Sequence, residues 1–324
     1  MIRFPKRYTN FALALVLIFL TAIAIFTLTS KPRSSLTLKA SQNKFQASFQ
    51  LSKYDRYLAE SFLQNANIPQ NILNGIEFTL DGTSSAKLAY LSPIVTNLIF
   101  EKNRVDFKGS TETSLNLNTY SNDLEFSYPD ATTVILFGQN LLPYIKKSTN
   151  LPEDFKTWMD ENLKNTKGQY LILFGDKPDF ALAFSKELSP DFGKLKSLKV
   201  AAESYKEETQ DNVTFHLLKI TNTQNEENYI FFESGDLVYI TSSLESAKEL
   251  EQLQKSPQNN IFNVKTPVSF ALFIKNSPDH KADKALKFLV GNQQQLTKYV
   301  EKVKTATFYL NGKEFSGSVE LLPS

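Results

Sequence analysis

The chain begins with an apolar segment that is flanked by basic residues on its N-terminal side. Residues 11–29 form nineteen consecutive positions without a charged side chain. A helix of this length spans about 30 Å at ~1.5 Å per residue, which matches the hydrocarbon core of a bilayer. Because basic flanks stay on the cytoplasmic side, the pattern predicts a cytoplasmic stub over residues 1–10. A single transmembrane helix over 11–29 and a tether over 30–35 follow, and the rest of the chain is exported.

A cleaved signal peptide is the alternative reading of this segment. Ala22-Ile23-Ala24 offers small residues at cleavage-like spacing. The apolar run continues through Ile25 and Phe26, which favours a retained anchor. The predicted localisation is therefore the cell membrane, single-pass, with the N-terminus cytoplasmic and the C-terminal domain extracytoplasmic.

Beyond the tether, short apolar runs alternate with polar positions and are separated by Asn, Asp, Gly, Ser and Pro. A period of two is typical of strands: Phe180, Leu182 and Phe184 would share one face, and Ala181 and Ala183 the other. The predicted strands are residues 46–51, 75–80, 86–91, 98–100, 104–109, 132–137, 169–174, 179–185, 213–220, 228–233, 237–242, 267–275, 305–310 and 314–322.

Helical periodicity appears between these strands. Phe155, Trp158, Met159 and Leu163, for example, recur at the spacing of one helix face. The predicted helices cover residues 54–73, 140–164, 192–205, 245–253 and 279–302.

Three segments share the order strand, interrupted helix, two-strand hairpin. They cover residues 46–91, 132–185 and 267–322, and their hairpin turns are predicted at Asp81-Gly82, Gly175-Asp176 and Asn311-Gly312. The alternative is that β-α-β-β is a common arrangement and that only the turn residues align.

Duplication predicts an α+β fold, in which the N-terminal transmembrane helix is followed by an antiparallel sheet with helices on one face. The expected domains are a first α+β unit over 36–128 and a duplicated domain over 129–324. The units of the duplicated domain cover about 129–190 and 262–324.

The order of several short motifs carries a family resemblance. Pro129-Asp130-Ala131 precedes an apolar strand, a hairpin over 229–240 leads into Ser242-Ser243-Leu244-Glu245, and Pro267 introduces the last unit. Over residues 129–322 this order resembles a family of bacterial membrane-anchored proteins, domain-of-unknown-function family no. 3352. The resemblance implies an exported, anchored α+β domain, and it supplies no catalytic residues.

Composition and charge exclude several classes of chemistry. The 324 residues contain no cysteine, which excludes disulfides, thiolate metal sites and a cysteine nucleophile. Arg3, Lys6 and Arg7 of the stub account for three of the 36 basic residues, so the remainder carries 33 basic residues against 34 acidic ones. No basic patch remains to suggest nucleic acid as a partner.

The two histidines are the first candidates for chemistry. His216 lies in an alternating strand and is expected to be structural or at the surface. His280 lies in a predicted first helical turn, where a Ca²⁺ or Zn²⁺ site built with Asp279 and Asp283 is the less favoured alternative.

Other motifs point to ordinary structural roles. Glu207-Glu208 and Glu226-Glu227 are paired carboxylates that we expect to be solvated in polar loops rather than to act as an acid–base pair. The segment 312–317 has the wrong spacing for a nucleophile elbow. Hydrolase chemistry that uses Ser and Lys needs no local sequence motif, so the sequence does not exclude this class of enzyme.

The 26 phenylalanines are expected mainly in the core, with a groove for lipid or another apolar ligand as the alternative. We therefore expect a non-enzymatic binding or scaffolding domain of the bacterial envelope. The alternatives are a lipid or apolar-ligand module and an envelope hydrolase. No catalytic residue, cofactor-binding residue, metal ligand or cofactor is predicted. The expected partners are the membrane, through residues 11–29, and another envelope protein or lipid, and no nucleic acid.

Overall fold

Antiparallel strands dominate the described structure. The computed structural model describes residues 34–41, 44–51, 53–66, 68–79, 93–101, 103–113, 124–139, 152–163, 166–175, 180–186, 190–198, 204–221, 226–256, 260–264, 267–277, 279–280, 282 and 301–322. These residues divide into two units. Unit 1 lies within Tyr120–Pro267, and unit 2 combines residues of Pro5–Thr119 and Val268–Ser324.

Unit 1 is built on a sheet whose described strands run in the order β10-β11-β12-β13-β9-β8-β7, every neighbour antiparallel. A separate pair joins β6 to β14. The elements in chain order are β6 (Leu124–Ser127), β7 (Thr132–Gln139), α5 (Glu153–Leu163), β8 (Thr166–Gly175), β9 (Phe180–Lys186), the 3-10 helix η2 (Phe192–Ser197), β10 (Tyr205–Gln210), β11 (Val213–Thr221), β12 (Glu226–Ser234), β13 (Leu237–Thr241), α6 (Leu244–Lys255) and β14 (Ile261–Val264).

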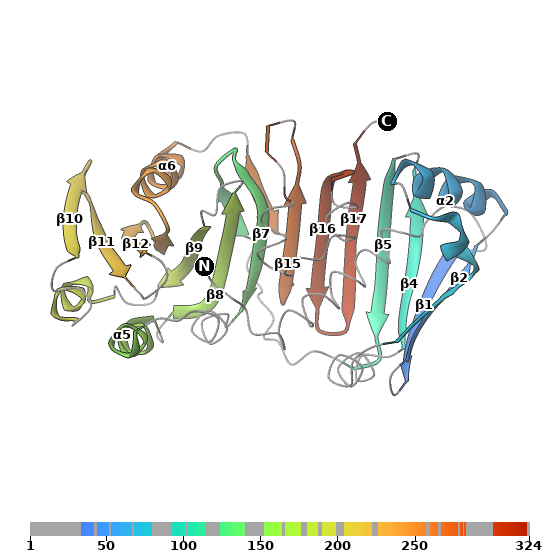
Figure 1. Cartoon of the computed structure of the whole chain (residues 1–324), viewed down its shortest axis with the longest axis horizontal. Coiled ribbons are helices and arrows are strands. Elements are labelled where there is room, and N and C mark those ends of the chain that lie inside the picture. The colour runs from blue at the N-terminus through green and yellow to red at the C-terminus, as the bar shows by residue number, and fades with distance from the viewer. Residues whose placement is uncertain are drawn as a thin grey trace. The chain divides into compact units, whose positions relative to one another are not determined.

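Helices cover both faces of the unit 1 sheet, and Figure 1 shows α5 and α6 on its opposite sides. On the α5 side, Phe155 and Trp158 of the helix pack with Leu182 and Phe184 of β9 in one buried cluster. On the α6 side, Tyr239 of β13 stacks on its cross-strand neighbour in β12. The faces predicted for β9 are therefore confirmed, and both are buried.

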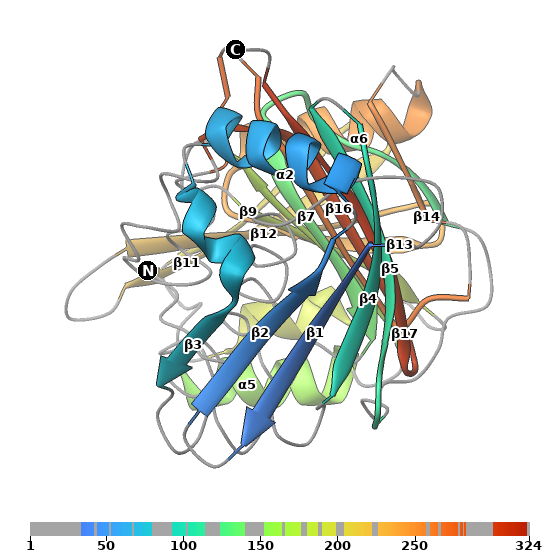
Figure 2. The same ribbon diagram turned by 90° about the vertical axis from the view of Figure 1, so that its right-hand side faces the viewer.

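The described strands of unit 2 run in the order β15-β16-β17-β5-β4-β1-β2-β3, and every neighbour is antiparallel. Figure 2 shows β3, β2, β1 and β4 side by side, with α2 near their ends. The elements are β1 (Ser34–Ser41), β2 (Lys44–Gln50), α2 (Lys53–Asn65), the 3-10 helix η1 (Gln70–Asn74), β3 (Ile76–Thr79), β4 (Ile94–Phe100), β5 (Arg104–Thr111), β15 (Phe270–Lys275), β16 (Val303–Asn311) and β17 (Glu314–Leu321).

One face of the unit 2 sheet packs against α2. Phe62 of α2 meets Phe100 of β4 edge to face at 5.6 Å, and Ser34 of β1 donates a hydrogen bond to the buried Asp55 of α2. Along β4, buried and exposed residues alternate strictly from Ile94 to Phe100. The opposite face of these strands therefore points away from α2.

The predicted α+β class is wrong, because the fold is largely β. Four strands had no expected counterpart: β1, β6, β10 and β14. At the ends of the predicted helix over 192–205 the structure has the 3-10 helix η2 and the start of β10, and residues 199–203 lie outside the described residues. Strand β10 contains only Tyr205 as an apolar residue and lies at the end of the sheet, so it has no period-two signal.

The predicted single-pass localisation and the transmembrane helix of the predicted fold class are contradicted. Among the described residues, none of the helices has the length and apolar character required to traverse a bilayer. The predicted stub and span, residues 1–29, lie outside the described residues.

The predicted repeat falls partly on described residues. Strands β7, β8 and β9 pair in chain order, and so do β15, β16 and β17. The helix break of the first copy is confirmed, since α2 ends at Asn65 and η1 begins at Gln70. Residues 81–91, 140–151 and 283–300 lie outside the description. The duplication and the predicted domain bounds stay predictions.

Candidate functional site

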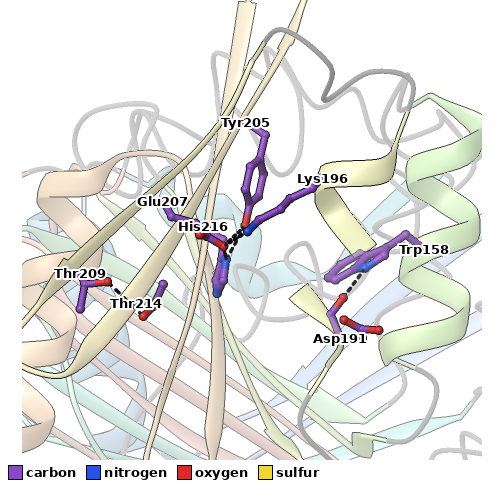
Figure 3. Close-up of polar contacts among 8 residues, drawn as sticks. All are labelled: Trp158, Asp191, Lys196, Tyr205, Glu207, Thr209, Thr214 and His216. Atoms are coloured by element: carbon purple, nitrogen blue, oxygen red, sulfur yellow. Dashed lines mark hydrogen bonds and ion pairs between the residues drawn. The ribbon is translucent and has the colours of Figure 1, made fainter. Parts of the chain in front are cut away.

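Two sequence candidates, His216 and Glu207, meet in unit 1. They are directly opposite in the register of β10 and β11, with their side chains on the same face of the hairpin. The hydroxyl of Tyr205 lies 2.7 Å from Glu207 Oε1 and 2.7 Å from His216 Nδ1. Lys196 of η2 reaches the same carboxylate oxygen, with Nζ at 2.9 Å. Figure 3 shows the four side chains converging, and we call them the Tyr205 network.

Counting protons fixes the direction of these hydrogen bonds. Interactions with Tyr205 and Lys196 lower the pKa of Glu207, so its carboxylate is ionised and only accepts. The single hydroxyl proton of Tyr205 is then donated to Glu207, and His216 Nδ1–H donates to the tyrosine oxygen. This assignment leaves Nε2 of the neutral imidazole without a proton.

Burial sets the protonation of the other two members. It is the largest cause that raises the pKa of Tyr205, and the negative charge of Glu207 adds to the effect. Burial also lowers the pKa of His216, against the opposing attraction of Glu207. Near neutral pH the network therefore holds an ionised carboxylate, a protonated phenol and a neutral imidazole.

Packing beneath the network fixes its position. Phe192 of η2 stacks on the His216 ring with centroids 4.7 Å apart. The residue before η2 is held by α5: Trp158 Nε1 donates to the Asp191 carbonyl at 3.1 Å, and the Asp191 amide donates to Asn162 Oδ1 at 2.9 Å. The network thus fastens η2, and through it α5, to the β10–β11 hairpin (Figure 3).

The remaining acidic candidates do not join this network. Glu208 points to the other face of β10, where Lys248 of α6 donates to it. Glu226 and Glu227 begin β12, so both acidic pairs lie on strands rather than in loops.

The candidates at residues 279–283 and 312–317 are described only in part. The His280 amide donates to Ser277 Oγ at 3.0 Å, Asp279 is exposed, and Asp283 lies outside the described residues. Within the described residues no three His, Cys, Asp or Glu side chains are grouped to hold a metal ion. Gly312 forms the β16–β17 turn at a φ of 58°, as a hairpin glycine.

A second candidate site is a sheet surface in unit 2. Val95 and Ile99 of β4 are exposed to 42% and 50%, with Asn97 between them on the same face. The register of β1, β2 and β5 surrounds this row with polar side chains. We call this surface the Val95 face; its described members are Ser35, Thr37, Lys39, Gln46, Ser48, Gln50, Val95, Asn97, Ile99, Arg104, Asp106, Lys108 and Ser110.

Sequence reasoning missed key residues of both sites. The sequence pattern assigned Tyr205 and Lys196 to a helix. The dipeptide Asp211-Asn212 was the overlooked sequence signal of a hairpin turn, and both residues have a positive φ in the structure. Val95 was missed because the predicted strand began at Leu98, so the alternation of β4 was cut short. Because apolar residues occupy both faces of β4, the residue types alone do not indicate which face is exposed.

Comparisons with known proteins are sparse. No protein-family model matches the chain, and no curated protein matches it significantly. The structure of crystal form I of TP0453 shares 13% identity with the chain at a TM-score of 0.34, covering 60% of this chain and 76% of that one. Similarity at this level supports no argument about function. The resemblance to family no. 3352 stays a prediction.

Proposed function

We propose that this protein is a non-enzymatic binding or scaffolding protein whose docking surface is the Val95 face of unit 2. The observation that carries the proposal is the pair Val95 and Ile99, exposed on one strand and one face within a polar surround. The outer face of an antiparallel sheet normally carries polar side chains toward water. An apolar row rimmed by polar groups is typical of a protein interface.

The spacing of the row suits an anchor role. Val95 and Ile99 are four residues apart along the strand, which corresponds to about 13 Å. Val95 lies opposite Thr37 and Ser110, and Ile99 lies opposite Asp106. Covering the exposed part of each would contribute about 1 kcal/mol. The surrounding Ser, Thr, Asn and Gln side chains supply donors and acceptors for a polar rim.

Site-specific photo-crosslinking in the producing cells tests the proposal. A photoreactive residue at position 97 is expected to form a discrete adduct, and Val95→Thr with Ile99→Thr is expected to abolish it. Both changes keep the β-branched shape and add a hydroxyl. The matched control is Ile261→Thr in β14, an aliphatic residue of unit 1 that is exposed to 43%; it is expected to leave the adduct intact.

Two results would count against this function. One is an adduct that survives the double Thr variant as well as it survives Ile261→Thr. The other is a turnover activity of the purified protein that Glu207→Gln abolishes, because that result would make the Tyr205 network catalytic.

A further inference from the structure

Two Asn-Gly dipeptides lie in unit 2, and their surroundings differ. Asn74 ends the 3-10 helix η1 and Gly75 leads into β3, whereas Asn311 ends β16 and Gly312 begins the turn to β17. Asn-Gly is prone to spontaneous deamidation, because glycine has no side chain to hinder the approach of its amide nitrogen to the asparagine side chain. The reaction is therefore open to both dipeptides, and the fold decides its rate at each.

A guanidinium group lies on the side chain of Asn74. Arg56 of α2 donates a hydrogen bond from Nη2 to Asn74 Oδ1 at 3.1 Å. The same guanidinium is held by Glu60, one turn further along α2, with Nε 3.2 Å from Oε1. Asn74 and Gly75 are both exposed, so water reaches the reacting groups. The Asn74 carboxamide is thus polarised by a positive charge at its oxygen atom.

The second dipeptide has opposite surroundings. The Gly312 amide, which is the group that would attack, donates to Ser269 Oγ at 3.5 Å. Asn311 lies opposite Glu314 in the register of β16 and β17, so a carboxylate shares its face of the hairpin. Negative charge that develops on the Asn311 side chain would be repelled by this carboxylate. The fold therefore favours deamidation at Asn74 over deamidation at Asn311.

We propose that Asn74-Gly75 is a site of spontaneous deamidation and that Arg56 promotes the reaction. The Gly75 nitrogen loses its proton to solvent and bonds to Asn74 Cγ. The Cγ–Nδ2 bond breaks, and the side-chain nitrogen takes a proton from solvent and leaves as ammonia. Water then opens the cyclic imide to aspartate or isoaspartate. Negative charge develops on Oδ1 during the attack, and Arg56 Nη2 already donates to that atom.

The two products differ in their effect on the fold. Aspartate at position 74 keeps the main chain and gives Arg56 a carboxylate partner, so the contact becomes a charge-assisted hydrogen bond. Isoaspartate adds one carbon to the main chain directly before β3, where Ile76 pairs with Ala47 of β2. The modification therefore adds a negative charge between α2 and β3, and its isoaspartyl form displaces the start of β3.

Peptide mass spectrometry of the incubated full chain tests the inference. The protein is held at pH 8 and 37 °C, and conversion of the carboxamide to a carboxylic acid is followed at both dipeptides in the same sample. Asn74 is expected to convert at least tenfold faster than Asn311. In denaturing urea the two rates are expected to agree within a factor of two to three. Equal rates in the folded protein, or a tenfold difference that persists in urea, would overturn the proposal.

Substitution of Arg56 tests its role in the reaction. Arg56→Met keeps an unbranched side chain without the guanidinium, and it is expected to slow conversion of Asn74 at least threefold. The matched control is Arg104→Met, which removes another exposed arginine of unit 2, paired with Asp106; it is expected to leave the rate at Asn74 unchanged. An Arg56→Met variant that converts as fast as wild type, or faster, would show that Arg56 does not promote the attack and would overturn the proposal.

Discussion

The Tyr239 hydroxyl is a buried polar group in an aromatic layer of unit 1. The residue is fully buried, its ring stacks on Phe232 at 4.6 Å, and Phe126 lies 6.4 Å away. Among the described residues its oxygen has no hydrogen-bond partner. Burial raises the pKa of this phenol well above its usual range, so it stays protonated. A buried hydroxyl without a partner loses its hydrogen bonds to water and forms none within the protein, which lowers the stability of the folded state.

Replacing Tyr239 with Phe is therefore expected to stabilise the protein by about 1 kcal/mol. Urea unfolding followed by circular dichroism measures the change. Tyr205→Phe is the matched comparison, because that hydroxyl contacts Glu207 and His216, and its loss is expected to cost about 1 kcal/mol. A destabilised Tyr239→Phe variant would mean that the hydroxyl bonds to an internal water.

His216 is expected to make stability depend on pH. Its folded pKa lies below the ordinary value of 6.5, so the unfolded chain takes up the proton first as pH falls. The stability contributed by the neutral imidazole is complete above pH 6.5 and declines below it. The charged groups that act on the ring are Glu207 on β10, Lys196 on η2 and Glu233 on β12.

Unfolding free energies at pH 7.5 and pH 5.5 test this sign. The wild type is expected to lose more stability between the two values than His216→Gln, which cannot titrate. Over this range Glu207, with its lowered pKa, stays ionised in the folded state and contributes little to the difference. A larger loss in the Gln variant would show that protonation of His216 stabilises the fold.

At the scale of elements, strands β5 and β17 are joined by two reciprocal Phe–Gly pairs. Phe315 lies opposite Gly109, and Phe107 lies opposite Gly317. A Cβ on Gly317 would lie 2.1 Å from the Thr307 carbonyl oxygen and 2.4 Å from the Phe107 ring. Each aromatic ring thus fills the space that the facing glycine leaves empty.

Gly317→Ala is expected to destabilise the protein by about 1–3 kcal/mol, because the added methyl overpacks a site closed by backbone. The midpoint of urea denaturation reports the loss. Ser316→Ala, the neighbouring position on the outer face of β17, serves as control and is expected to stay within about 0.5 kcal/mol of wild type. Equal effects of the two substitutions would refute the close packing.

Local sequence patterns predicted some of the strands and helices of unit 1 and missed others. Strands with clear alternation, such as β9 and β11, were predicted within a few residues. The N-terminus of α6 was visible in Ser243, whose hydroxyl accepts from the Ser246 amide at 3.2 Å. Strand β10 was missed because its pairing with β11 depends on the partner strand and not on its own apolar residues.

At the scale of the whole molecule, one unit is built from a continuous stretch of chain and the other from two distant stretches. Unit 1 comes from Tyr120–Pro267, whereas unit 2 joins β5 to β17, more than 200 residues apart in sequence. Each unit has buried aromatic residues of its own, such as Phe231 in unit 1 and Phe62 in unit 2. The units are therefore expected to open independently.

Hydrogen–deuterium exchange of the full chain tests this independence. Gly317→Ala is expected to speed exchange in β16, β17 and β5 and to leave β11, β12 and β13 at wild-type rates. Tyr205→Phe is expected to do the reverse. Faster exchange across both units from either substitution would mean that they unfold as one cooperative body.

The amino-acid sequence by itself determined the positions of most strands, because alternation, turn residues and capping are properties of neighbouring residues. It also excluded thiol chemistry. Only the tertiary structure decided that polar segments such as β10 are strands, that Tyr205 and Lys196 converge on Glu207 and His216, and that Val95 and Ile99 face outward. These outcomes depend on register and on contacts between residues far apart in the chain, and a local pattern contains neither.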